Sequence, residues 1–166
     1  LCQQGKNFTN KIWNALRLVN GWEIDKEKSQ PMVNKLGIDW YNNKFNNSLE
    51  LINKNFENYR ISDVLMSSYR LVWDDFCSWL LEILKPDFGE KIDKKSRTEL
   101  ISLFEKNLKI LHPFMPFLTE EIYHNLPDIN NSTPLTISNW PEMEDYNQKS
   151  VNEFETTKEI ISQIRN

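Results

Sequence analysis

The sequence predicts an all-α fold: a helix bundle with a short irregular crossover and a C-terminal helix. Apolar side chains recur every three or four residues in several long segments, which is the spacing of one buried helix face. The stretch from Leu108 to Pro127 continues this pattern through Pro113 and Pro116, which lack the N–H that a helix interior needs. It therefore predicts two buried helices separated by a kink. With 166 residues, 39% of them apolar, the chain is long enough to enclose one core.

Composition excludes several classes of protein. No run approaches the roughly 18 consecutive apolar residues that a membrane-spanning helix needs. The N-terminus lacks both the apolar region of a signal peptide and an initiating Met, so we expect a fragment of a longer protein. Cys2 and Cys77 are too few for a disulfide framework, which favours the reducing cytoplasm.

Charge is unevenly distributed along the chain, whose net charge is −4. Residues 1–35 carry 6 basic and 3 acidic side chains, and residues 85–111 carry 7 and 5. Residues 112–166 carry only 3 basic and 9 acidic side chains. We therefore expect a nucleic-acid contact on the first helix or near residues 85–109, and not on the acidic C-terminal third. A chance imbalance on solvated faces is the alternative interpretation.

The first helix is expected from Lys6 to Asn20, ending before Gly21. Its core face is predicted to contain Phe8, Ile12, Ala15, Leu16 and Val19. Its other faces carry amide and basic groups that can bond base edges or phosphates, although the chain has 20 Asn and any single one is a weak indicator. Residues 21–37 are predicted to form a polar loop, in which Trp22 is either a lid over the core or a platform on which a base stacks.

The next two helices are expected at Asp39–Asn58, with Asp39 as the N-cap, and at Ser62–Leu84. On the first of these, the predicted buried face contains Tyr41, Phe45, Leu49, Ile52 and Phe56. On the second it contains Leu65, Tyr69, Val72, Phe76, Leu80 and Ile83. Both patterns have the helical spacing of an amphipathic segment.

A fourth helix is expected from about Asp93 to the kink at His112–Pro113, with Pro116 opening the helix that follows. Around and after Pro116, apolar residues recur at helical spacing and predict one strongly apolar face: Phe114, Phe117, Leu118, Ile122 and Leu126. Residues 128–149 are expected to form an irregular cover, with a brief strand or extended piece at 135–137 and Trp140 pinning it to the bundle. Ser150 and Glu153 form a capping box that predicts a last helix, cut off at Asn166.

Three segments together resemble one family. They are KNFTNKIWNALRLV at residues 6–19, WDDFCSWLLEILKP at 73–86 and LHPFMPFLTEEIY at 111–123. In this order they resemble the anticodon-binding domain of class I aminoacyl-tRNA synthetases, specifically that of the valyl-tRNA synthetases, over about residues 5–165. An isoleucyl or leucyl type would share the fold, but WDDFC favours the valyl type. A helical protein-interaction module, insensitive to salt and to RNA, is the alternative from a different class.

Catalytic motifs are absent from the sequence. It has no glycine-rich phosphate loop, no HExxH and no CxxC pair, and the ATP-binding elements of class I synthetases are also missing. Asp74 and Asp75 point about 100° apart on a helix, so an ion-pair role is favoured over metal or acid–base chemistry. Cys77 is interpreted as a small buried apolar residue, and two His are too few to predict a metal site. The resemblance therefore implies a single domain, residues 1–166, that is not catalytic by itself.

The resemblance implies that the domain binds the anticodon stem and loop of valine tRNA. It further implies a cytoplasmic parent enzyme, a monomer, whose separate catalytic and editing domains join valine to tRNA with ATP and Mg²⁺. We expect no cofactor, metal or membrane contact in this chain. As tRNA-binding residues we predict Lys11 and Arg17 for phosphate or base edges, Asn14 for a base hydrogen bond and Trp22 for stacking.

Overall fold

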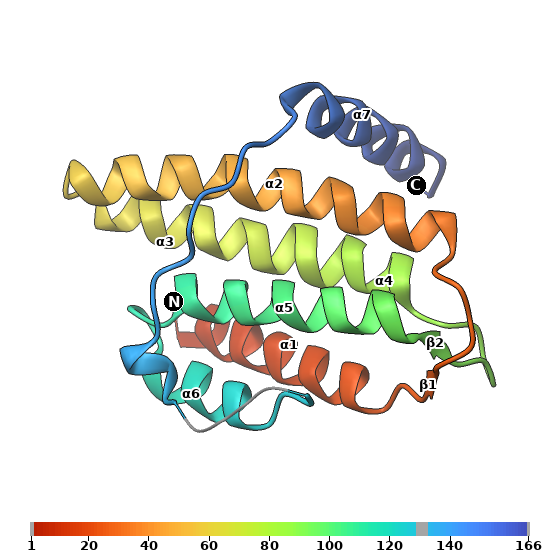
Figure 1. Cartoon of the computed structure of the whole chain (residues 1–166). Coiled ribbons are helices and arrows are strands. Elements are labelled where there is room, and N and C mark those ends of the chain that lie inside the picture. Colours follow the sequence, from red (N-terminus) through yellow and green to blue (C-terminus); the bar gives the residue numbers. More distant parts are fainter. Residues whose placement is uncertain (1, 129–132, 166) are drawn as a thin grey trace.

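The computed structural model describes residues 2–128 and 133–165, and almost all of the regular structure in them is helical (Figure 1). The elements are α1 (Cys2–Asn20), β1 (Ile24–Asp25), α2 (Met32–Glu57), α3 (Ile61–Arg70), a π-helix (Leu71–Leu80), α4 (Leu81–Leu84), β2 (Ile92–Asp93), α5 (Lys94–Leu111), α6 (Pro116–His124), a 3₁₀ turn (Leu135–Ile137) and α7 (Gln148–Arg165). This architecture confirms the all-α bundle.

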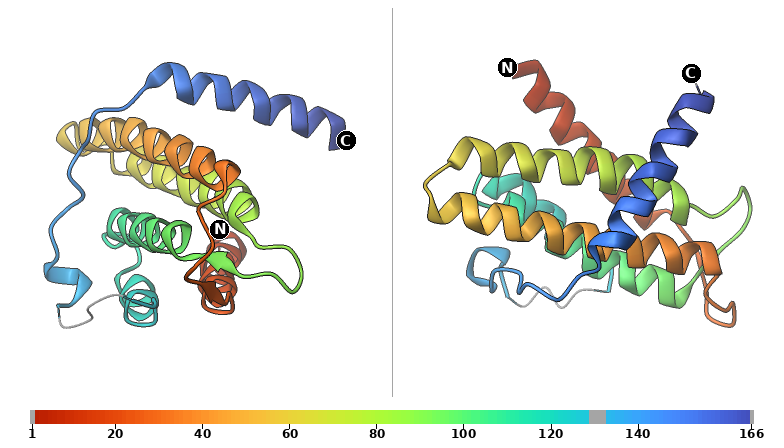
Figure 2. Two further views of the ribbon diagram at one scale, coloured as in Figure 1. Left: turned by 45° about the vertical axis from the view of Figure 1, so that its right-hand side comes forward. Right: turned by 90° about the horizontal axis from the view of Figure 1, so that it is seen from above.

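The helices form stacked layers around one core. The rod made by α3, the π-helix and α4 runs back along α2, and α5 lies beneath this pair (Figures 1 and 2). Helices α1 and α6 cover the opposite side, and α7 crosses the outer face of α2. Phe76 of the π-helix is fully buried, with its ring centroid 5.6 Å from that of Tyr41 on α2 and 4.9 Å from that of Phe104 on α5. The apolar faces of α2 and α5 therefore meet at the π-helix.

The third predicted helix is indeed continuous, but its middle third follows a wider turn. In the π-helix, residues five apart lie above one another, so Leu71, Phe76 and Leu81 are all buried. A 3.6-residue pattern extended back through this turn selects Leu65, which is 38% exposed, whereas Val64 lies in the core. The prediction for Leu65 is therefore wrong by one position.

The predicted loop at residues 21–37 is wrong beyond Pro31, where α2 already begins. Asp39 is thus an exposed residue inside the helix and not its cap. Glycine at 37 lets α2 approach the rod closely, because a Cβ atom there would lie 2.8 Å from Cγ2 of Ile83. The apolar side chains in the first turn of α2, including Met32, are exposed and do not belong to the buried face of this helix.

Helix α6 begins at Pro116 as predicted, but Phe117 is 91% exposed. The inward face of α6 consists of Thr119, Ile122 and Tyr123, and Phe117 lies on the other side. The crossover that follows forms a 3₁₀ turn at residues 135–137, so the extended piece predicted there is wrong. The predicted irregular cover includes residues 129–132, which lie outside the described residues, as does Asn166.

Trp140 pins the crossover to the bundle as predicted. Its Nε1 donates a hydrogen bond to Oδ1 of Asn53 at 3.0 Å, and its ring packs edge-on against Phe56, centroid to centroid 5.7 Å. The carboxylate of Glu120 on α6 fixes the 3₁₀ turn by accepting the backbone N–H of Leu135 at 2.8 Å and of Thr136 at 3.2 Å. Residues far apart in sequence thus hold the crossover against two helices.

Helix α7 begins earlier than the predicted Ser150 cap. Oδ1 of Asn147 accepts the N–H of Lys149 at 3.0 Å and of Ser150 at 3.2 Å, and so performs the capping. Phe154 of α7 stacks on Trp40 of α2, with ring centroids 4.1 Å apart. The aromatic contact and the buried Val151 fix the first half of α7 on the bundle.

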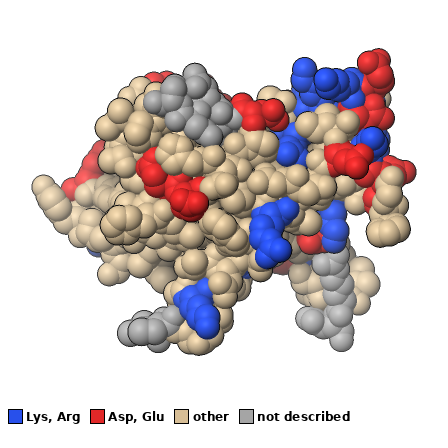
Figure 3. Space-filling model, turned by 90° about the horizontal axis from the view of Figure 1, so that it is seen from below, with Lys and Arg blue, Asp and Glu red and all other residues tan. Residues whose placement is uncertain are grey.

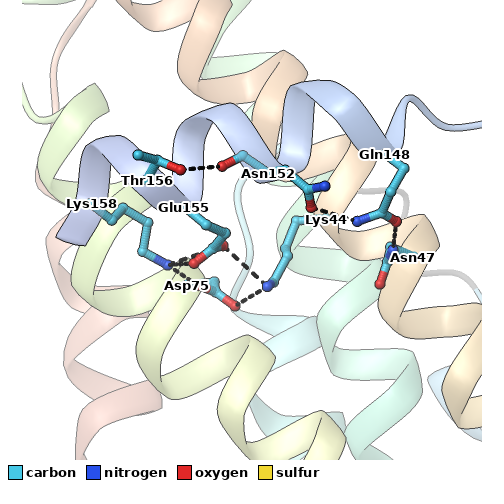
Figure 4. Close-up of polar contacts among 8 residues, drawn as sticks. All are labelled: Lys44, Asn47, Asp75, Gln148, Asn152, Glu155, Thr156 and Lys158. Atoms are coloured by element: carbon cyan, nitrogen blue, oxygen red, sulfur yellow. Dashed lines mark hydrogen bonds and ion pairs between the residues drawn. The ribbon is translucent and has the colours of Figure 1, made fainter.

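Four charged residues join α7 to α2 and the π-helix (Figure 4). Nζ of Lys158 lies 2.5 Å from Oδ1 of Asp75 and 3.1 Å from Oε2 of Glu155. Lys44 of α2 lies 3.1 Å from Glu155 and 3.9 Å from Asp75. Burial raises the pKa of Asp75 even though both lysines oppose it. Because Asp75 is almost inaccessible, its charge needs these partners.

Replacing Gly37 with alanine should lower the free energy of unfolding by about 1–2 kcal/mol, because the penalty for overpacking against Ile83 outweighs the gain in helix propensity. Gly5→Ala is the matched control, since a Cβ atom at Gly5 meets no heavy atom within 4 Å. It should raise stability by up to about 1 kcal/mol. Urea denaturation of both variants measures the difference, and equal effects would contradict the close approach.

Replacing Lys158 with methionine should lower the free energy of unfolding by about 2–4 kcal/mol, because Asp75 keeps only the more distant Lys44. Amide hydrogen exchange should show α7 losing protection first. Lys149→Met removes an exposed ion pair on the same helix and should change stability by less than about 0.5 kcal/mol. Equal effects of the two variants would show that the buried cluster does not hold α7.

Candidate nucleic-acid interface

Helix α1 has one buried apolar face and one exposed polar face. The five predicted core residues of this helix are all buried, which confirms its inward face. Asn7, Asn10, Asn14 and Arg17 are exposed and follow one another at three- and four-residue spacing. The exposed stripe that they form, which we call the α1 stripe, leads along the helix to Gly21. At 1.5 Å per residue the stripe extends for about 15 Å from Asn7 to Arg17.

Lys11 does not belong to the α1 stripe. Its ammonium donates a hydrogen bond to Oγ of Ser78 at 2.7 Å and lies 4.1 Å from the ring centroid of Trp73. Ser78 in turn donates to the carbonyl oxygen of Trp73, five residues earlier in the π-helix, at 2.9 Å. The first and second family-like segments therefore contact each other here, and Lys11 joins α1 to the π-helix.

Trp22 lies just beyond the end of α1, half-buried against the core. The backbone N–H groups of Gly21 and Trp22 donate to carbonyl oxygens in the last turn of α1, those of Arg17 at 3.1 Å and Val19 at 3.3 Å. Of the four predicted site residues, the structure thus brings Asn14, Arg17 and Trp22 into successive turns. The Lys11 side chain contacts the π-helix instead.

Arg97, which the sequence reasoning missed, holds this end of α1. Its side chain is 4% exposed, and Nη1 donates to the carbonyl oxygen of Val19 and, at 3.3 Å, to that of Trp22. A cation is favourable there because the C-terminal end of a helix carries partial negative charge. The sequence did contain one indication that Arg97 is buried, because it falls on the same face of its helix as the apolar residues Leu100 and Phe104.

A cleft of about 530 Å³ opens beside Trp22. It is lined by Gly21, Trp22 and Glu23 after α1 and by residues 85–91 between α4 and β2. The parallel pair of β1 and β2 joins the two walls, with Ile24 opposite Ile92. The two parts of the chain with an excess of basic residues therefore come together at this end of the bundle.

The charges at this end are mixed (Figure 3). Seen from the side of α1 and α6, lysine and arginine gather at the end of β1 and β2, with acidic side chains among them. Lys91 lies 2.8 Å from Glu23, and Lys28 lies 3.0 Å from Glu90. The hydrogen bond and charge of Lys91 lower the pKa of Glu23. This surface is therefore not a uniform phosphate-binding patch.

The remaining reactive side chains have structural surroundings. Burial raises the pKa of Cys77 to about 12, so its thiol is protonated at neutral pH, as its interpretation as an apolar residue requires. Nδ1 of His112 lies 2.8 Å from Oγ1 of Thr119, so this ring takes part in a hydrogen bond. Within residues 2–128 and 133–165, no three His, Cys, Asp or Glu side chains come together to hold a metal ion. None of the helices in these ranges combines the length and apolar character needed to span a bilayer.

Comparison with known proteins decides the family. A family model described as the anticodon-binding domain of tRNA ligase matches residues 39–166. The chain belongs to this family. Similar curated proteins are the valine–tRNA ligases of Christiangramia forsetii, 47% identical, Parabacteroides distasonis, 38%, and Phocaeicola vulgatus, 41%. Each alignment covers 99% of this chain and 19% of the relative.

These relatives confirm the valyl type that the WDDFC segment predicted. The chain spans about a fifth of their length and corresponds to their anticodon-binding domain. The family model begins at residue 39, after α1, whereas the alignments with the relatives include α1. The segment that forms α1 therefore has a counterpart in these valine–tRNA ligases.

Replacing Lys11 with methionine should lower the free energy of unfolding by about 1–2 kcal/mol, through loss of the hydrogen bond to Ser78 and of the contact with Trp73. A double-mutant cycle with Ser78→Ala should give a coupling of at least about 0.5 kcal/mol. Lys6→Met changes an exposed lysine on the same helix and should have little effect. Strictly additive losses at 11 and 78 would contradict the link between α1 and the π-helix.

Proposed function

We propose that this domain binds the anticodon stem and loop of a tRNA, namely the valine isoacceptor, through the α1 stripe and Trp22. The α1 stripe supports this best: amide and guanidinium groups stand exposed on a helix whose other face is fixed in the core. Such groups bond base edges and phosphates, and an aromatic ring beside them stacks unpaired bases. Asn14 and Arg17 contact the RNA, Trp22 stacks, and Lys11 acts mainly by holding α1 in place.

The parent protein in this proposal is a cytoplasmic, monomeric valine–tRNA ligase. It joins valine to its tRNA with ATP and Mg²⁺ in a catalytic domain outside this chain, and an editing domain belongs to the same parent chain. The anticodon-binding domain contributes binding energy far from the reacting ester, and this energy positions the acceptor end of the tRNA. The domain by itself performs no chemistry.

A titration of this chain tests the proposal, with valine tRNA and an anticodon-mutated copy at two salt concentrations. Preference for the native anticodon and weakening with salt are the expected results, because contacts to phosphates release counterions. Equal and weak binding to both tRNAs would contradict anticodon recognition by this domain. Salt-independent binding would contradict the participation of phosphates.

Replacing Arg17 with alanine should weaken tRNA binding by roughly tenfold, the effect of losing one hydrogen bond from a charged donor. Arg17 is exposed, so helicity and unfolding should stay unchanged. Arg70→Ala removes an exposed arginine on α3 and serves as the control. Equal binding by wild type and Arg17→Ala would remove Arg17 from the site.

A further inference from the structure

The cleft beside Trp22 has a second aromatic wall. Phe88, in the loop between α4 and β2, lines the same cleft and is fully exposed at 108%. Single exposed apolar residues are ordinary on protein surfaces, so exposure alone does not indicate a binding site. Here, however, an exposed phenylalanine and a half-buried tryptophan share one cleft whose volume falls in the range typical of small-ligand sites, about 300–1,000 Å³.

The conformation of this loop places Phe88 at an exposed position. The backbone N–H of Glu90 donates to the carbonyl oxygen of Asp87 at 2.9 Å, which closes a four-residue turn. Gly89 has φ = +81°, the value that the third residue of a type II turn requires and that glycine adopts without strain. Phe88 therefore occupies the corner of a hydrogen-bonded turn.

The two walls of the cleft are joined behind the aromatic rings. The N–H of Ile92 donates to the carbonyl oxygen of Glu23 at 2.9 Å, next to the pairing of β1 with β2. Arg97 holds the backbone of Trp22 from the other side. Both walls are thus positioned before any ligand arrives, which reduces the entropy that binding would cost.

The charges of the lining favour a neutral ring over a phosphate. Two lysines line the cleft, but three carboxylates, those of Glu23, Asp87 and Glu90, accompany them. One of the lysines, Lys91, is already paired with Glu23. A phosphate would therefore meet more negative than positive charge, whereas a base would meet the two aromatic side chains that line the cleft.

We propose that this cleft takes one unpaired nucleobase of the bound tRNA, stacked against Phe88 and Trp22. This inference rests on the proposed function and extends it to Phe88. The α1 stripe leads from Asn14 and Arg17 directly to Gly21 on the rim of the cleft, so a strand that follows the stripe reaches it. Stacking uses the face that every base has, so the cleft contributes affinity more than it selects a base.

The test measures dissociation constants of this chain for valine tRNA and for a series of copies that each lack one base of the anticodon loop. Phe88→Ala should weaken binding of the intact tRNA by roughly 5- to 150-fold, and Phe88→Tyr should restore most of it. At one loop position, removal of the base should weaken wild type but not Phe88→Ala, because both changes remove the same contact. The matched control is Phe117→Ala, which removes another highly exposed phenylalanine, on α6.

The outcomes separate this inference from the proposed function. If Arg17→Ala weakens binding and Phe88→Ala does not, the domain binds tRNA but the cleft takes no base. Additive effects of Phe88→Ala and base removal at every position would also overturn the inference. So would a Phe88→Ala variant that loses self-association but binds the tRNA as tightly as wild type, because Phe88 would then contact a second copy of the chain. If wild type does not bind the tRNA, the proposed function and this inference fail together.

Discussion

The π-helix is the constraint on which the rest of the bundle depends. Ten residues, Leu71–Leu80, present side chains to four different helices: Trp73 and Ser78 to α1, Phe76 to α2 and α5, and Asp75 to α7. An ordinary α-helix would bring fewer of these side chains into contact with neighbouring helices. Its buried residues recur every 3.6 positions along one stripe, and its other faces are exposed to solvent. Such wide turns are rare, and here the turn is held by contacts with these four helices.

The position of Asp75 follows from the same turn and explains why α7 docks in one way. A buried carboxylate is tolerated only with compensating charge, and Lys158 and Lys44 supply it from two different helices. Lys158 also lies 5.2 Å and 5.5 Å from the ring centroids of Trp40 and Trp79, so its ammonium faces aromatic rings as well as the carboxylate. Apolar contacts alone would let α7 slide along α2, whereas an ion pair at a fixed point sets its register.

Much of the fold could be predicted because helix periodicity is a local property. The buried faces of α1 and α2 follow from the spacing of their apolar residues, and the role of Pro116 follows from its missing N–H. The failures share another cause: they depend on neighbours that the sequence does not reveal. Gly37 lies inside α2, where a Cβ atom would meet Ile83 at 2.8 Å, and this tertiary neighbour cannot be seen in the sequence. The π-helix shifted the predicted face of α3, and nothing in a 3.6-residue pattern announces it.

The candidate site shows the same division between local and tertiary information. Exposure of Asn14 and Arg17 follows from their helix face, but the internal contacts of Lys11 needed Ser78, 67 positions away. The charge distribution pointed to two separate regions, and only the pairing of β1 with β2 brings them to one cleft. There the ion pairs neutralise much of the positive charge that suggested the site, as at Lys91 and Glu23. The amide and guanidinium groups of the α1 stripe and the ring of Phe88 remain exposed beside these charged side chains. In the proposed function, base contacts by these groups would therefore act together with attraction of phosphate.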